Sequence, residues 1–151
     1  MTNNKNIDNL QIIVTNLAQQ AEGHFIQAKI FEAKGFSKLA EKYKEHTEEE
    51  REYVEKCIDR IIDLGGKVKL ENKTGTEVFE NPVDFIKYDL QVSINGLKLL
   101  KDMLNDAKDD LTTFDLLKDY YKDEEEDMYW GEQQLETIEM IGEQNWLIKQ
   151  M

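Results

Sequence analysis

The sequence predicts one all-α domain, an antiparallel four-helix bundle with a long crossover between its second and third helices and a short C-terminal helix. Three observations predict it. Long stretches repeat apolar residues at three- and four-residue spacing. Proline occurs once, and the glycines fall mainly between these stretches. A chain of 151 residues suffices for one hydrophobic core. We therefore assign residues 1–151 to a single domain.

The first half of the chain predicts two helices. The first covers about residues 7–34, and Gly35 supplies its stop. The second covers about residues 37–64 and ends at Gly65 and Gly66. The apolar or small positions of the first helix are Leu10, Ile13, Leu17, Ala21, Ala28 and Phe31. Because two or three residues join the two helices, they must be antiparallel neighbours.

The second half predicts two further long helices and a short one. Asn81 followed by Pro82 predicts the start of a helix over residues 82–107, because asparagine caps helices and proline fits the first helical position. A fourth helix is predicted over 112–141 and a short fifth over 144–150.

The connection over residues 65–81 has no helical period. A helix of about 28 residues is about 42 Å long at about 1.5 Å per residue. An extended chain covers that length in about 13 residues at about 3.3 Å each. The connection can therefore run the full length of the bundle, which permits the second and third helices to be parallel.

Charge and composition restrict the function. The 32 acidic and 19 basic residues give a net charge of −13, which repels a phosphate backbone and attracts cations, although solubility alone also explains such an excess. We expect no nucleic-acid partner. No apolar stretch reaches about 18 residues and the N-terminus lacks a leader pattern, so we expect no membrane contact and a cytoplasmic location. One cysteine, Cys57, cannot form an internal disulfide.

Polar side chains interrupt the buried stripe near the middle of each helix. They are Gln20 and His24 in the first helix, His46, Glu50 and Tyr53 in the second, Ser93 in the third, and Glu124 and Asp127 in the fourth. Because all four interruptions fall near mid-height, we expect them to face one another. Three acids in a dry interior cannot all stay ionised without compensation.

Two interpretations resolve this conflict. A divalent cation bound by Glu50, Glu124 and Asp127, with help from His24 or Tyr53, would neutralise the acids, and oxygen ligands suit iron or another hard cation such as manganese. The alternative is a hydrated polar cavity in which one carboxyl is protonated and Tyr53 and His24 donate hydrogen bonds. The residue pattern leaves both open.

Two segments resemble the bacterioferritins and their Dps-like relatives: FIQAKIFEAKGFSKLAEKYKEHTEEEREYVEKCIDRIIDLGG and DEEEDMYWGEQQLETIEMIGEQNWL. The resemblance spans nearly the whole chain. It implies a ferritin-like fold, iron storage in a hollow homo-oligomeric shell, and a di-iron site inside each bundle. The implied shell has 24 or 12 copies, with a dimer as the alternative.

The resemblance also implies an altered ligand set. By position, Glu50 and Glu124 match the Glu of the two Glu-x-x-His motifs, Tyr53 and Asp127 take the places of the two His, and Leu17 and Ser93 replace the remaining two Glu. His24 replaces a buried tyrosine beside the site and is a candidate ligand. The changes favour slow or lost ferroxidase-type oxidation and leave open whether the chain is an enzyme.

The same resemblance concerns two further sites. Arg51 falls where bacterioferritins have a haem-ligating Met, so we expect no haem. Glu45 and Glu49 match an inner-surface iron site, and His46 is a neighbouring candidate. We therefore predict an iron-binding cage subunit for iron storage and detoxification. The alternative is a non-catalytic structural or assembly protein that no longer binds metal in the bundle.

Overall fold

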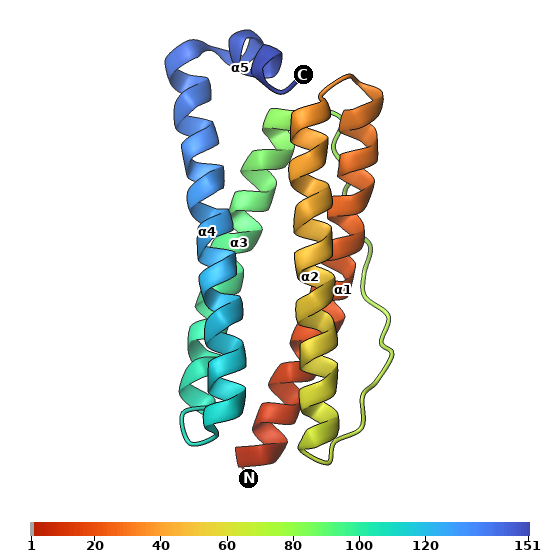
Figure 1. Ribbon diagram of the computed structural model, residues 1–151, viewed down its shortest axis with the longest axis vertical. Helices are drawn as coiled ribbons and strands as arrows, with labels where there is room; N and C mark the ends of the chain where they lie inside the picture. Colours follow the sequence, from red (N-terminus) through yellow and green to blue (C-terminus); the bar gives the residue numbers. More distant parts are fainter. Residues whose placement is uncertain (1) are drawn as a thin grey trace.

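The structure is a computed structural model that describes residues 2–151, with side chains from Asn4 onward. Within these residues the chain forms helices and no strands (Figure 1). The helices are α1 (Thr2–Ala33), α2 (Ser37–Asp63), α3 (Pro82–Asp106), α4 (Leu111–Ile141) and α5 (Glu143–Lys149). The predicted all-α bundle with a short C-terminal helix is confirmed.

The helix ends lie within one residue of the expected ones, except that α1 begins at Thr2 instead of near residue 7. Two asparagines extend the contact of α1 with the α3–α4 turn. The Asn9 side chain donates to the Asp106 carboxylate at 3.0 Å, and Asn6 approaches Asp110 at 3.5 Å. These polar contacts fix the first turns of α1, and apolar spacing alone does not reveal them.

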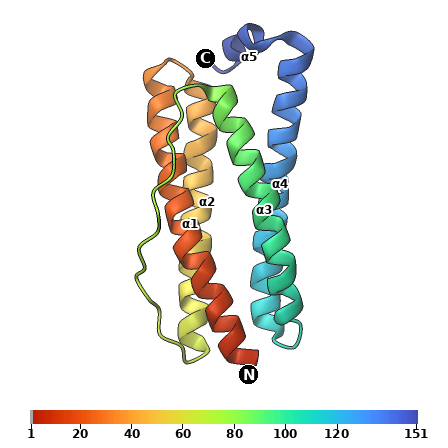
Figure 2. The same cartoon turned by 180° about the vertical axis from the view of Figure 1, so that it is seen from behind.

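The topology follows from the order of the helices along the bundle. Figures 1 and 2 show α1 and α4 running in one direction and α2 and α3 in the other, with the crossover alongside α1 from one end of the bundle to the other. The parallel α2 and α3 confirm the expected full-length crossover. Gly35 and Gly65, at φ of 92° and 80°, end α1 and α2 in a conformation that other residues rarely adopt.

Three glutamines of α1 fasten the crossover. The Gln11 amide donates to the Lys69 carbonyl at 3.0 Å and accepts from the Lys69 N–H at 2.8 Å. Gln27 makes the same pair of bonds to Phe79, both at 2.8 Å, and Gln19 donates once, to the Thr74 carbonyl. Successive glutamines are eight residues apart, or about 12 Å at about 1.5 Å per residue, so the three attachments are spread along the length of α1. The crossover is thereby held at both ends without secondary structure of its own.

Two apolar cores lie at different heights in the bundle. The core nearer the N-terminus comprises Leu10, Ile13, Val14, Leu17, Cys57, Ile61, Leu100, Met103, Ala107, Leu117 and Tyr120. The other comprises Ala28, Phe31, Leu39, Ala40, Tyr43, Val83, Phe85, Ile86 and Trp146. Between them lies a buried layer of polar side chains. The bundle interior therefore changes chemistry at mid-height, where the sequence predicts it.

Helix α5 closes one end of the bundle. Its Trp146 is buried in the second core, and the indole N–H donates to the Gln134 side chain at 2.9 Å. No helix in the described part of the chain combines the length and apolarity that spanning a membrane requires.

We predict that Gln27→Ala lowers the free energy of unfolding by about 1 to 3 kcal/mol, because two backbone groups of Phe79 lose their partner. Denaturant unfolding at a fixed protein concentration measures it, and hydrogen exchange at the Phe79 amide should accelerate. Gln19→Ala, which removes one exposed bond, is the control and should cost less. Equal losses for the two variants would contradict a specific clamp at Phe79.

Candidate functional site

The polar layer is built by all four long helices. Its side chains are almost fully buried at His24 of α1, Glu50 of α2, Ser93 of α3 and Glu124 of α4, with exposed fractions of 2 to 4%. The expectation that the four interruptions lie in one interior is thus met for these residues. Glu50 and Glu124 supply carboxyl groups from two helices, Ser93 supplies a hydroxyl from α3, and His24 supplies an imidazole from α1.

His24 forms the centre of the layer. Its Nδ1 lies 2.5 Å from Oε1 of Glu50, and its Nε2 lies 2.9 Å from Oδ1 of Asp89. One imidazole ring therefore connects α1 with both α2 and α3. Both ring nitrogens can donate to carboxylates only when the ring carries two protons and a positive charge.

The electrostatic setting of His24 supports the charged form. Burial lowers the pKa of the imidazole, but the Asp89 and Glu50 carboxylates outweigh it and raise the pKa well above its usual range. For Glu50, burial raises the pKa of the carboxyl and the charge of His24 opposes that shift. The ring thus acts as an internal counter-ion. Hydrogen bonds between an imidazolium and a carboxylate are stronger than hydrogen bonds between neutral groups.

Two acids of α4, Glu124 and Asp127, are not paired with a positively charged side chain among the residues that the structure describes. Burial raises the pKa of Glu124 to about 7, although a hydrogen bond from Ser93 favours its ionised form. Burial, together with Glu124 and Asp123, raises the pKa of Asp127 to about 9. Both shifts favour the protonated form of these acids, and the shift is larger for Asp127. Protonation reduces the repulsion that three ionised acids would produce.

His46 lies in the same interior but is neutral. Burial and the neighbouring charge of His24 lower the pKa of this imidazole to about 3. Its Nε2 is 3.4 Å from Oδ1 of Asp127, and neither ring nitrogen has a hydrogen-bond partner. The sequence predicts His46 beside the inner-surface set, whereas the structure buries its side chain at 3% exposure. Its side chain turns into the bundle because it lies one turn before Glu50 on the buried stripe.

Asp89 is the site residue that the sequence interpretation missed. It is 17% exposed and pairs with His24. A signal was present, because Asp89 stands four residues before Ser93 and three after Ile86, on the buried stripe of α3. Through Asp89, α3 does supply a carboxylate, one turn away from the serine.

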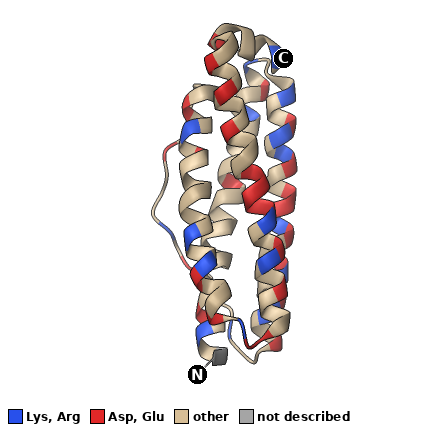
Figure 3. Ribbon diagram, turned by 90° about the vertical axis from the view of Figure 1, so that its left-hand side faces the viewer, with Lys and Arg blue, Asp and Glu red and all other residues tan. Residues whose placement is uncertain are grey.

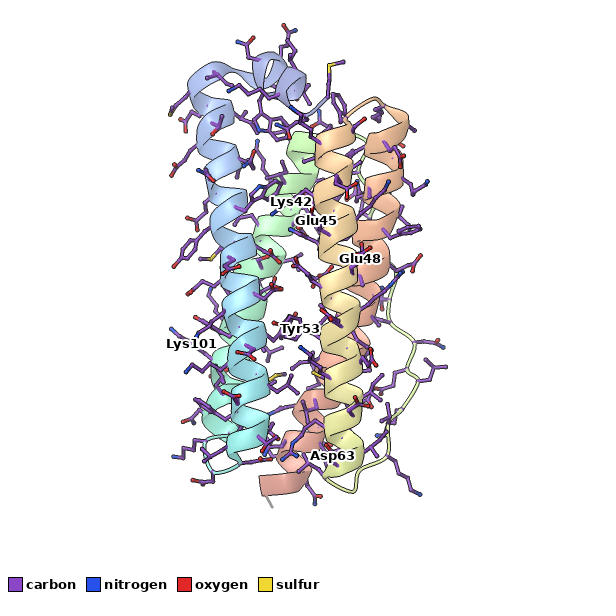
Figure 4. All side chains as sticks on the ribbon, viewed as in Figure 1. Lys42, Glu45, Glu48, Tyr53, Asp63 and Lys101 are labelled. Carbon is purple, nitrogen blue, oxygen red and sulfur yellow. The ribbon has the colours of Figure 1, made fainter. Side chains whose placement is uncertain are left out.

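Tyr53, a predicted candidate ligand, lies outside the buried layer. It lies on the side of α2 that faces α4 (Figure 4), where its ring packs on Tyr120 with centroids 5.1 Å apart. Its hydroxyl donates to the Asp119 carbonyl at 3.4 Å. Burial raises the pKa of the phenol to about 12, which opposes a phenolate ligand.

The remaining candidates lie on the outside of the chain. Glu45 and Glu49 are exposed, and Figure 3 shows acidic residues concentrated near mid-height of the molecule. Burial and the Asp123 carboxyl raise the pKa of Glu49, and the two side chains are hydrogen-bonded. Arg51 is also exposed. It pairs with Glu22 at 3.3 Å and lies over the Phe25 ring at 5.7 Å.

The layer does not form a ready-made coordination shell. Among the described side chains, no three of the types His, Cys, Asp and Glu are placed to hold one ion together. The physical reason lies in His24, whose ring occupies the space between Glu50 and Asp89 and uses one oxygen of each. The second oxygen of Glu50, Oε2, has no partner although the residue is only 2% exposed.

Comparison with known proteins agrees with the resemblance. A family model described as a ferritin-like domain matches residues 7–141. A bacterial ferritin of Neisseria meningitidis serogroup B is 34% identical over 151 residues, which cover 96% of each chain. A bacterial ferritin of Pseudomonas aeruginosa is 29% identical with the same coverage. A bacterioferritin of Streptomyces coelicolor is 27% identical over 126 residues, 82% of this chain and 75% of that one. The family match spans the helices that carry the polar layer.

We predict that the metal-free protein loses stability as pH rises from about 5 to 9. The raised pKa of Asp127 means that the folded state holds a proton that the unfolded state releases near pH 4. The stabilisation that this proton provides is fully present below the pKa of Asp127 in the unfolded state. It is lost as the pH rises to the pKa of Asp127 in the folded state, by at most about 1.4 kcal/mol per pH unit for one group.

Asp127→Asn should make this slope shallower and stabilise the protein at pH 8. Denaturant unfolding in chelator at several pH values measures it. Asp59→Asn, at an exposed aspartate of α2, is the control. A slope equal to that of the unchanged protein would show that Asp127 is ionised in the folded state.

Proposed function

The chain belongs to the ferritin-like family, and on that premise we propose that it is an iron-binding cage subunit that stores and detoxifies iron. The observation that carries the proposal is the buried layer of carboxyl groups from α2, α3 and α4. Oxygen ligands suit Fe(II), which enters here as substrate and cargo. A net charge of −13 also raises the local concentration of cations.

We propose Glu50, Glu124 and Asp127 as the groups that meet Fe(II) inside the bundle. Oxidation there is slow or lost, for two reasons. Leu17 places a fully buried apolar side chain on α1 where the family resemblance implies a Glu. His24 holds Glu50, so an incoming ion must displace the ring before it reaches that carboxylate. Other divalent cations with the same preference for oxygen face the same obstacle.

Further properties belong to the same proposal. The chain assembles with itself into a shell of 24 or 12 copies in the cytoplasm, and Glu45 and Glu49 collect iron on the inner surface. No haem is bound, since the Arg51 guanidinium pairs with Glu22 and cannot act as a soft thioether ligand.

One observation favours a second candidate function, a structural or assembly member of the family without metal in the bundle. The Glu50–His24–Asp89 bridge neutralises buried charge without any ion. A bundle stabilised in this way folds and assembles whether or not iron is present.

Aerobic Fe(II) addition distinguishes the two functions. As an iron-storing subunit, the protein should form a ferric product above a buffer blank, and light scattering should detect a shell. An anomalous difference map from iron-soaked crystals should place iron in the bundle, on the inner surface, or in both. No ferric absorbance and an empty map would leave only the structural function.

The double variant Glu50→Gln with Glu124→Gln tests the bundle ligands. We expect this variant to lose all iron between the helices. It should remain folded, because each glutamine keeps an acceptor oxygen and each substitution removes one buried charge. Iron retained in the bundle would remove these two residues from the proposal. Loss of folding, seen by circular dichroism, would assign both carboxylates a purely structural role.

A further inference from the structure

His24 is held in one orientation by its neighbours. Its ring stacks on Tyr43 with centroids 5.5 Å apart and an interplanar angle of 22°. Phe85 meets it edge-on at 6.0 Å. Together with the bonds to Glu50 and Asp89, these contacts keep the imidazole between the two carboxylates. A cation cannot occupy the same space as the ring.

A cavity lies next to His24 on the side of α1 and α3. Its volume is about 510 Å³, and the crossover contributes to its wall at Lys73 and residues 76–78. His24, Asp89 and Glu124 line it together with apolar side chains. The cavity has room for a swung imidazole ring, and α1 opens onto it at Gly23, where an added Cβ would meet nothing within 4 Å.

The carboxyl groups around the ring retain unused bonding capacity. Glu50 keeps Oε2 unpartnered at 2% exposure, so the bridge satisfies only part of this carboxylate. Glu124 lines the cavity together with Asp89 and His24, and the charges of Glu50 and Asp89 both raise its pKa. If the ring left its position, Glu50 and Asp89 would lose their shared partner, and both could turn toward an ion together with Glu124.

Resting on the function proposed above, we propose that His24 is a gate that competes with a divalent cation for Glu50 and Asp89. In the closed state the imidazole bridges the two carboxylates, as the structure shows. In the open state the ring swings into the adjoining cavity, and Glu50, Asp89 and Glu124 bind one cation. His24 is thus a specificity-determining residue, because an entering ion must bind these acids better than the bridge does.

Mn(II) binding to His24→Gln tests the gate. Glutamine is uncharged and cannot reach both acids, so the variant should bind one Mn(II) per chain at least tenfold more tightly than the unchanged protein. Titration followed by electron paramagnetic resonance measures the affinity. Adding Glu50→Gln and Glu124→Gln to the variant should abolish the gain, which separates the bundle from the acidic surface. Gln20→Ala, which alters the same cavity but not the bridge, should leave the affinity unchanged.

An anomalous map of the Mn(II)-loaded His24→Gln variant should place the ion between Glu50, Asp89 and Glu124. Equal affinities for the variant and the unchanged protein, or an ion bound elsewhere, would overturn the gate. If His24→Gln does not fold, His24→Tyr takes its place, since tyrosine can donate to only one acid, and the same two outcomes decide.

The gate and the storage function fail in different ways. An unchanged protein that mineralises iron, with a variant that binds Mn(II) no better, refutes the gate and leaves storage intact. A variant that gains the site, in a protein that forms no ferric product and whose iron-soaked crystals give an empty map, supports the gate and refutes storage.

Discussion

The bridge from Glu50 through His24 to Asp89 joins three helices within the buried polar layer. An unpaired carboxylate in that position would be strongly destabilising. Removing one partner of a buried ion pair costs about 3 to 5 kcal/mol, because the other charge is left without compensation. The bridge removes this cost and fixes the relative positions of α1, α2 and α3. The apolar cores above and below it can therefore pack as continuous layers around a polar centre.

The fold could be predicted from the sequence because each element has a local signal. Asn81 accepts hydrogen bonds from the backbone N–H groups of Val83 and Asp84, as its position before Pro82 predicts. The glycines after α1 and α2 adopt the positive φ that ends a helix. Loop length then fixes which helices are neighbours. The early start of α1 had no such signal, since it depends on contacts with residues about a hundred positions away.

For the site, the sequence could predict only the helical face and the approximate height of each residue. Periodicity places His24, Glu50, Ser93 and Glu124 at one height, and the structure agrees. Periodicity does not say which partner a side chain selects, because that depends on rotamers and on neighbours from other helices. Tyr53 turns to the Asp119 carbonyl because Tyr120 gives its ring a packing surface.

Stability alone does not account for the polar layer. Apolar residues of similar volume in place of a buried ion pair are often neutral or stabilising, by about 1 to 4 kcal/mol. Leu17 shows that an apolar side chain packs well on α1 only two turns from His24. A chain selected only for a firm bundle has no need of Glu50 and Asp89, or of a histidine to neutralise them. The cation binding proposed above supplies that need, since the bridge neutralises these acids in the metal-free state until an ion displaces the ring.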